Sequence, residues 1–171
     1  MVCREFKMLG RSRGLVAVSA MTAMLGLAAP TAGQTKNLGI FGGWEVSSVH
    51  DKGKFVRCIA DTTGPNNQGL RMSFGDDGQR QFILPGPGTA GAKDEVVIVL
   101  RPSGKRFTFP MAQRSPDRLW SPALENGFTD VFFESRRMEV QLPARNVTRS
   151  FDLGDPDAMS ARIDGCMTSH Q

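Results

Sequence analysis

The chain has 171 residues, of which 40% are hydrophobic and 22% are charged, with a formal net charge of +4. This length fits one ordinary domain, because domains typically hold about 100–150 residues. Apolar residues are ample and charge is moderate, which excludes collagen, coiled coils and wholesale disorder. No apolar run reaches the roughly 18 residues of a membrane-spanning helix, so we expect no stable membrane span.

The first 33 residues have the three parts of a secretory signal peptide. Four basic residues stand at the start: Arg4, Lys7, Arg11 and Arg13. An apolar stretch follows over residues 15–29, and small residues gather over residues 28–33. We therefore predict a signal peptide over residues 1–33 and a single domain over residues 34–171. Cleavage after Ala28, Ala32 or Gly33 and a start at Met1 or Met8 all fit the pattern.

Removal of the leader changes the charge balance. Residues 1–33 hold four basic residues and one acidic residue, so the remainder carries 17 basic and 16 acidic residues, a net charge of +1. A nucleic-acid-binding surface needs a strong positive excess, so we expect no nucleic-acid partner. The leader instead indicates a periplasmic or secreted protein.

Two cysteines remain after the leader, Cys58 and Cys166. An even count in an oxidising compartment predicts one disulfide, which would close a loop of roughly one hundred residues. The alternative is two separate thiols. Neither cysteine belongs to a C-x-x-C or Cys–His arrangement that would favour a redox or nucleophilic role.

Short alternating runs separated by turn residues follow the leader and predict a series of strands. In chain order they cover residues 44–49, 55–60, 70–74, 80–84, 96–100, 107–111, 118–121, 129–134, 138–142 and 150–153. A Gly- and Pro-rich segment at residues 85–92 is expected to be a loop. This spacing predicts an all-β fold, an antiparallel sandwich or barrel, with one C-terminal helix.

The helix is predicted over residues 155–165. Asp155 suits the N-cap, Pro156 the first helical position and Asp157 the positive end of the helix dipole. Gly165 is a natural C-terminal stop.

No motif for chemistry was found. His50 and His170 are the only histidines, and neither has a zinc-ligand spacing. The acidic run at residues 152–157 lacks the glutamate that closes an EF-hand loop, and no nucleophile elbow or phosphate-binding loop occurs. We expect no catalytic residues, no cofactor and no metal, with an enzyme of unfamiliar site as a weaker alternative.

One segment could form a partner-binding surface. Phe132 and Phe133 are adjacent, so in a strand their side chains face opposite sides of the sheet. One of the two rings would then be exposed or covered by another element, and Arg136 and Arg137 just beyond would border the surface. The alternative is a fully buried strand followed by a solvated turn.

Two segments resemble the invasion-associated locus B family of exported bacterial proteins. The opening sequence FGGWEV at residues 41–46 is near the family's F-G-x-W-x-V, and Cys58 follows about a dozen residues later. The closing residues 150–154 and 158–166 are similar to the last strand, Ala-rich helix and final cysteine of some members. Gly43 stands where the family usually has aspartate, and additional cysteines of many members are absent. The resemblance implies an envelope β-sandwich without established catalysis, linked in pathogens to host-cell invasion.

Together these features predict an exported periplasmic or envelope protein that binds an envelope or host protein without catalysis. The alternative is a small periplasmic inhibitor of a hydrolase, such as a lysozyme or a protease. In that case the loop at residues 85–93 would reach into the enzyme's cleft.

Overall fold

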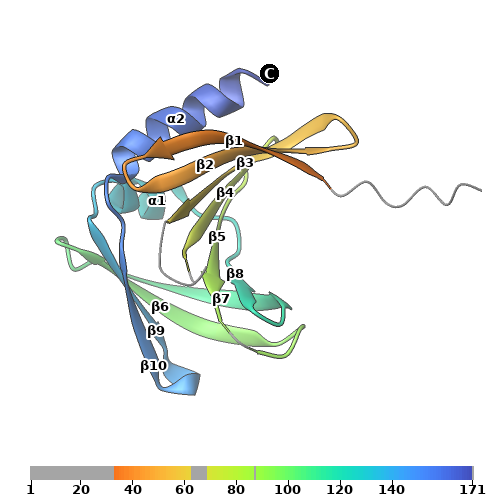
Figure 1. Ribbon diagram of the computed structural model, residues 1–171. Coiled ribbons are helices and arrows are strands. Elements are labelled where there is room, and N and C mark those ends of the chain that lie inside the picture. The colour runs from red at the N-terminus through yellow and green to blue at the C-terminus, as the bar shows by residue number, and fades with distance from the viewer. Residues whose placement is uncertain (1–32, 63–68, 87, 171) are drawn as a thin grey trace, which may run out of the picture. The chain divides into compact units, whose positions relative to one another are not determined.

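The fold is described from a computed structural model, which covers residues 33–62, 69–86 and 88–170 (Figure 1). The predicted signal peptide lies outside these residues except for Gly33.

Ten strands form one antiparallel sheet in the order β1-β2-β3-β4-β5-β8-β7-β6-β9-β10. The strands are β1 (Gln34–Phe41), β2 (Trp44–Asp51), β3 (Lys54–Thr62), β4 (Arg71–Gly75), β5 (Arg80–Pro85), β6 (Lys93–Arg101), β7 (Arg106–Ser115), β8 (Arg118–Trp120), β9 (Arg137–Leu142) and β10 (Val147–Asp152). The helices are α1 (Asn126–Phe133), α2 (Pro156–Thr168) and the short 3-10 helix η2 (Pro143–Arg145).

The predicted fold class is confirmed: the chain is mostly antiparallel sheet with a C-terminal helix. Two details differ from the prediction. The sheet is not closed into a barrel, because β1 and β10 stand at its two ends. A second α-helix, α1, precedes β9. No helix in the described part of the chain is long and apolar enough to cross a membrane.

The strand predicted over residues 129–134 is wrong, because this segment lies in α1. β-branched and aromatic residues suggested a strand there. The buried side chains of Phe128, Val131 and Phe132 instead follow helical spacing, three and four residues apart. Tertiary packing of that face outweighed the local preference for extended structure.

Strand β1 was not predicted. Its first four residues are all exposed, so they carry no alternation of apolar and polar side chains. As the end strand of the sheet, β1 pairs with β2 alone, and only its later residues Leu38 and Phe41 pack against the core.

Helix α2 begins with Pro156, as predicted, but continues past Gly165 to Thr168. Its buried face consists of Pro156, Met159, Ile163 and Cys166. Because Cys166 lies beyond the glycine and belongs to this face, packing on the sheet extends the helix where local sequence predicts a stop. The helix contacts β1, β2 and β3 (Figure 1).

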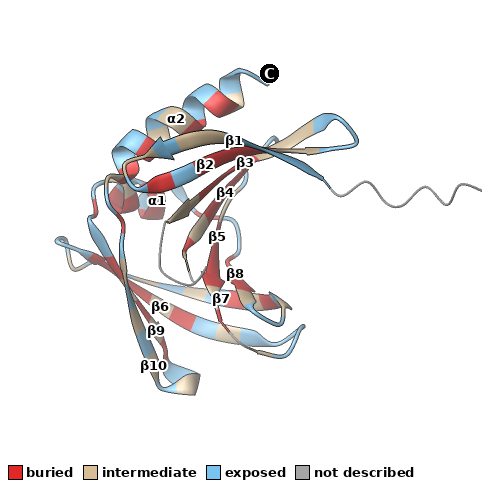
Figure 2. Cartoon of the chain, in the orientation of Figure 1, coloured by how far each residue is buried: buried red, intermediate tan, exposed pale blue. Residues whose placement is uncertain are grey.

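The core lies on the face of the sheet that α2 covers. Side chains of β2 to β5 that point to this face are buried together with α1 and the inward residues of β6, β7 and β9 (Figure 2). Trp44 is fully buried, and its indole Nε1 donates a hydrogen bond of 2.6 Å to the backbone oxygen of Leu153. The buried indole therefore has a partner for its polar atom.

The two segments that resemble the invasion-associated locus B family meet in space. Asp155 N donates a hydrogen bond of 2.7 Å to Gly42 O. Gly42 and Gly154 both have positive φ, +60° and +58°, and a Cβ on either would collide with backbone of the opposite segment. Only glycine permits both the conformation and the close approach. The opening and closing segments are thus in direct contact through Gly42, Gly154 and Asp155.

The predicted disulfide is present between Cys58 on β3 and Cys166 on α2, with a Cα–Cα distance of 6.4 Å and a sequence separation of 108. Both residues are buried. The bond fixes the C-terminal helix to an early strand.

Candidate binding groove

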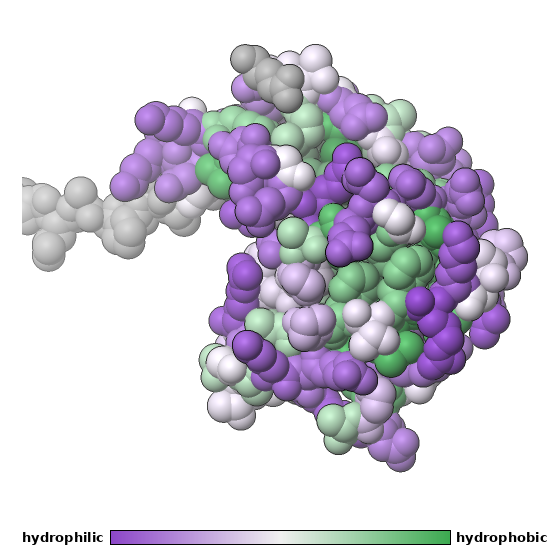
Figure 3. Space-filling model, turned by 180° about the vertical axis from the view of Figure 1, so that it is seen from behind, coloured by the Kyte–Doolittle hydropathy of each residue, from purple (hydrophilic) through white to green (hydrophobic). Residues whose placement is uncertain are grey.

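A groove lies on the face of the sheet opposite α2. Successive side chains of a strand point to opposite faces. Because Cys58 bonds to α2, its neighbours Arg57 and Ile59 point away from the helix. They line a cavity of about 710 Å³ that crosses β1, β2, β3, β4, β5 and β8. Figure 3 shows the molecule hollowed beside the β2–β3 hairpin, with mainly hydrophilic residues around the hollow.

The floor of the groove is a row of small and aliphatic side chains. Ser47, Ile59 and Ser73 lie directly opposite one another on β2, β3 and β4. All three are buried. Short hydroxyl side chains at these positions leave room above the sheet while keeping hydrogen-bonding groups at the floor.

An ion pair lies across the middle of the groove. The guanidinium of Arg71 donates from Nε and Nη2 to the two carboxylate oxygens of Asp61, at 2.7 and 2.9 Å. This side-chain hydrogen bond raises the pKa of Arg71 further above its usual range. Paired donors of this kind hold the two side chains in a fixed geometry.

A second carboxylate stands beside this pair. Glu45 on β2 lies directly opposite Asp61 on β3. Like charges in opposed positions repel. Asp61 is bound to Arg71, and Glu45 Oε1 accepts a hydrogen bond of 2.5 Å from Asn37 Nδ2 on β1. The carboxylates and the guanidinium are therefore held in place as hydrogen-bond acceptors and donors for a bound partner.

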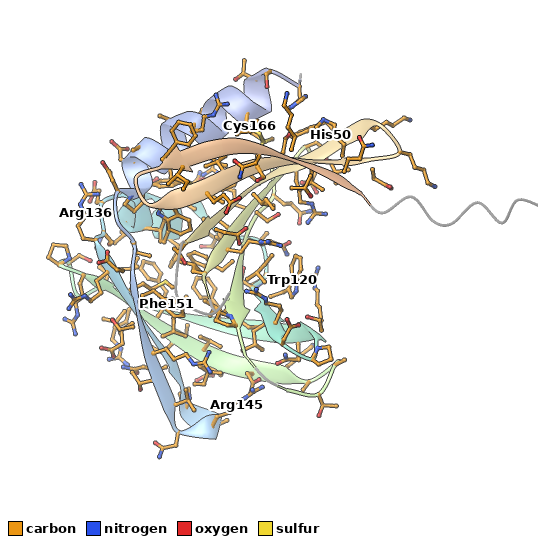
Figure 4. The ribbon with its side chains drawn as sticks, in the orientation of Figure 1. His50, Trp120, Arg136, Arg145, Phe151 and Cys166 are labelled. Carbon is orange, nitrogen blue, oxygen red and sulfur yellow. A yellow bond between two sulfur atoms is a disulfide. The ribbon has the colours of Figure 1, made fainter. Side chains whose placement is uncertain are left out.

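Glu45, Asp61 and Arg71 belong to one cross-strand row, which continues through Ile83 on β5. Trp120 on β8 lies opposite Ile83 and ends this row (Figure 4). Its ring is half-buried, and the guanidinium carbon of Arg114 lies 5.0 Å from the ring centroid. An aromatic wall beside polar groups can contact both apolar and polar parts of a partner.

Sequence reasoning missed this groove. Asp61, Arg71 and Trp120 lie far apart in the chain, and no local spacing connects them. Only the register of the strands aligns them in one row.

The predicted partner-binding surface does not form as one patch. Phe132 is fully buried, with its ring centroid 6.0 Å from Trp44 and 5.3 Å from Phe82. The prediction that Phe132 belongs to an exposed surface is wrong, because Phe132 lies on the buried face of α1 and points into the core. Phe133 is half-buried beside it, whereas Arg136 and Arg137 are exposed.

Arg136 has a local partner. Its Nη1 donates a hydrogen bond of 2.9 Å to Asp155 Oδ1 (Figure 4). This bond lowers the pKa of the Asp155 carboxyl below its usual range. Asp155 precedes α2 as predicted, but it makes no side-chain capping hydrogen bond there.

The Gly- and Pro-rich loop after β5 forms backbone hydrogen bonds with the neighbouring β7–β8 turn. Gly86 N and Gly88 N donate to the backbone oxygens of Asp117 and Pro116, both at 2.9 Å. Its later residues 89–93 are exposed. Inhibition of a hydrolase through this loop stays a prediction.

The two histidines lie close together. His50 is on β2 and His170 follows α2, yet their ring centroids are 5.0 Å apart. Across the described ranges, no group of three or more His, Cys, Asp or Glu residues is placed to hold a metal ion.

No protein-family profile matches the chain, and no curated protein matches it in sequence. One solved structure is similar: the crystal structure of invasion associated protein B from Bartonella henselae, with a TM-score of 0.58 and 13% sequence identity. The match covers 80% of this chain and 98% of that one. At this identity the likeness shows a similar fold and nothing about activity.

Proposed function

We propose that this chain is an exported binding protein of the bacterial periplasm or envelope, and that it binds a partner protein in the groove without catalysing a reaction. The observation that carries the proposal is the groove itself. Its floor is built from buried small and aliphatic residues, Asp61 and Arg71 hold each other, and Asn37 holds Glu45. Preorganised polar groups lose little freedom when a partner binds, which favours recognition.

The partner is expected to be another envelope protein or a host protein. An open groove that crosses six strands suits a loop or an extended segment of a protein, whose backbone and side chains supply matching donors and acceptors. The groove is lined by both acidic side chains, Glu45 and Asp61, and basic ones, Arg57 and Arg71, which favours a segment that carries both charges.

Export is supported by the leader pattern and by the buried disulfide, because disulfides persist mainly in oxidising compartments. We expect the full chain, produced in a bacterial host, to accumulate in the periplasm with a new N-terminus between residues 29 and 34. N-terminal sequencing of the periplasmic fraction checks this. Intact protein that starts at Met1 or Met8 and stays in the cytosol would contradict export.

Binding is tested by photo-crosslinking in the cell. A photoreactive residue replaces Thr35, which is exposed and lines the groove. The control carries it at the exposed Lys105, in the β6–β7 turn away from the groove. We expect a discrete protein adduct from position 35 and none from position 105.

The same adduct should fall at least about tenfold when Arg57→Glu reverses a groove charge. It should persist when Arg106→Glu reverses a charge at an exposed site on β7. Equal crosslinking from positions 35 and 105, or no effect of Arg57→Glu, would rule out the groove as the binding site.

A further inference from the structure

His50 and His170 come from opposite ends of the described chain. His50 lies next to the last residue of β2, and His170 lies just beyond the C-terminal end of α2. Figure 4 shows His50 beneath that end of the helix, which carries Cys166. The disulfide fixes the helix to β3, the strand that pairs with β2. The covalent link therefore brings the backbone of the two histidines close together without any contribution from a ligand.

Phe55 sets the plane of one ring. It lies opposite His50 in the β2–β3 register, and its ring stacks on His170 with a centroid distance of 4.4 Å and an interplanar angle of 12°. Stacking uses the faces of the rings, so the two nitrogens of His170 lie at the ring edge. The His50 ring meets Phe55 edge-on, with a centroid distance of 5.8 Å.

The spacing of the two rings fits a shared metal ion. A metal–nitrogen bond to histidine is about 2.0–2.1 Å, which puts the ring centre about 3.2 Å from the metal. Two rings whose centroids are 5.0 Å apart then subtend an angle of roughly 100° at the metal, between the square and tetrahedral values.

We propose that His50 and His170 together bind one divalent transition-metal ion of the zinc, nickel and copper class, for which imidazole is a preferred ligand. The remaining coordination positions are filled by water or by a donor from a partner. His170 is exposed and His50 is half-buried, so an ion can reach the pair from solvent. His50 also lines the groove, but metal binding by the pair is tested separately from partner binding there.

The test is a calorimetric titration of the full disulfide-bonded chain with zinc and, separately, nickel. Any sample that keeps residue 3 carries Cys3→Ser, because a free thiol would itself bind these metals. We expect one metal ion per chain and a metal-dependent rise in melting temperature, since the ion links two elements of the folded state.

The decisive variants are His170→Phe and His50→Phe. Phenylalanine keeps an aromatic ring for Phe55 to contact but removes the nitrogens. We expect each variant to weaken metal binding at least about tenfold and to abolish the metal-dependent rise in melting temperature, while the metal-free melting temperature stays near that of the unsubstituted chain. Lys52→Ala, on the adjacent exposed turn, is the matched control and should bind as before.

Two outcomes would overturn the proposal. One is an absence of metal binding to the unsubstituted chain, which would leave only an aromatic cluster. The other is unchanged binding in the double variant His50→Phe/His170→Phe, since these are the only histidines in the chain.

Discussion

Replacing Cys58 and Cys166 together by alanine is expected to lower the free energy of unfolding by about 4–5 kcal/mol, the largest effect of any change considered for this protein. The disulfide closes a loop with a sequence separation of 108. In the chain-entropy model a loop of this length restricts the unfolded chain strongly, and removing the bond restores that freedom. A loss of this size is a large part of the ~5–15 kcal/mol that stabilises a typical domain.

Denaturant unfolding followed by tryptophan fluorescence measures the change, because Trp44 is fully buried. A reducing agent provides the matched control. It should lower the unfolding midpoint of the unsubstituted chain and leave the double alanine variant unchanged. A variant within about 1 kcal/mol of the unsubstituted chain would mean that the bond adds little to stability.

Replacing Phe132 by alanine is expected to cost about 3–5 kcal/mol of stability. The side chain is fully buried, and its ring meets Trp44, Phe82 and Phe128 at centroid distances of 6.0, 5.3 and 6.0 Å. Truncation removes its apolar area and leaves a cavity that rigid neighbours fill only in part.

The adjacent Phe133 provides the matched control. It is half-buried and lies on the same helix, so Phe133→Ala should cost roughly 1 kcal/mol, since less apolar surface is lost. Thermal or denaturant unfolding of both variants measures the difference. Equal losses for the two phenylalanines would contradict the position of Phe132 in the core.

These two phenylalanines also show why the sequence predicted a strand where the structure has a helix. Adjacent aromatic residues favoured a strand, in which one ring would be exposed. The spacing of Phe128, Val131 and Phe132 is the available indication of a helix. In a segment this short, helical and extended patterns compete closely, and packing against Trp44 and Phe82 decided between them.

Most strands were predicted because they alternate visibly. In Leu70, Met72 and Phe74, for example, every second residue is apolar, and all three are buried in the core. Strand β1 lacks such alternation because its first four residues are all exposed, whereas β10, at the other edge of the sheet, alternates and was predicted. Alternation therefore identifies a strand only where one of its faces is buried.

The sequence by itself determined the antiparallel fold class, the start of the C-terminal helix and the pairing of Cys58 with Cys166, since these follow from local alternation, local capping chemistry and a count of two cysteines. Tertiary structure alone decided the helix at residues 126–133, the row of Glu45, Asp61, Arg71 and Trp120 in the groove, and the meeting of His50 with His170. Strand register and helix docking bring these residues together across long separations, and no local pattern encodes a contact of that kind.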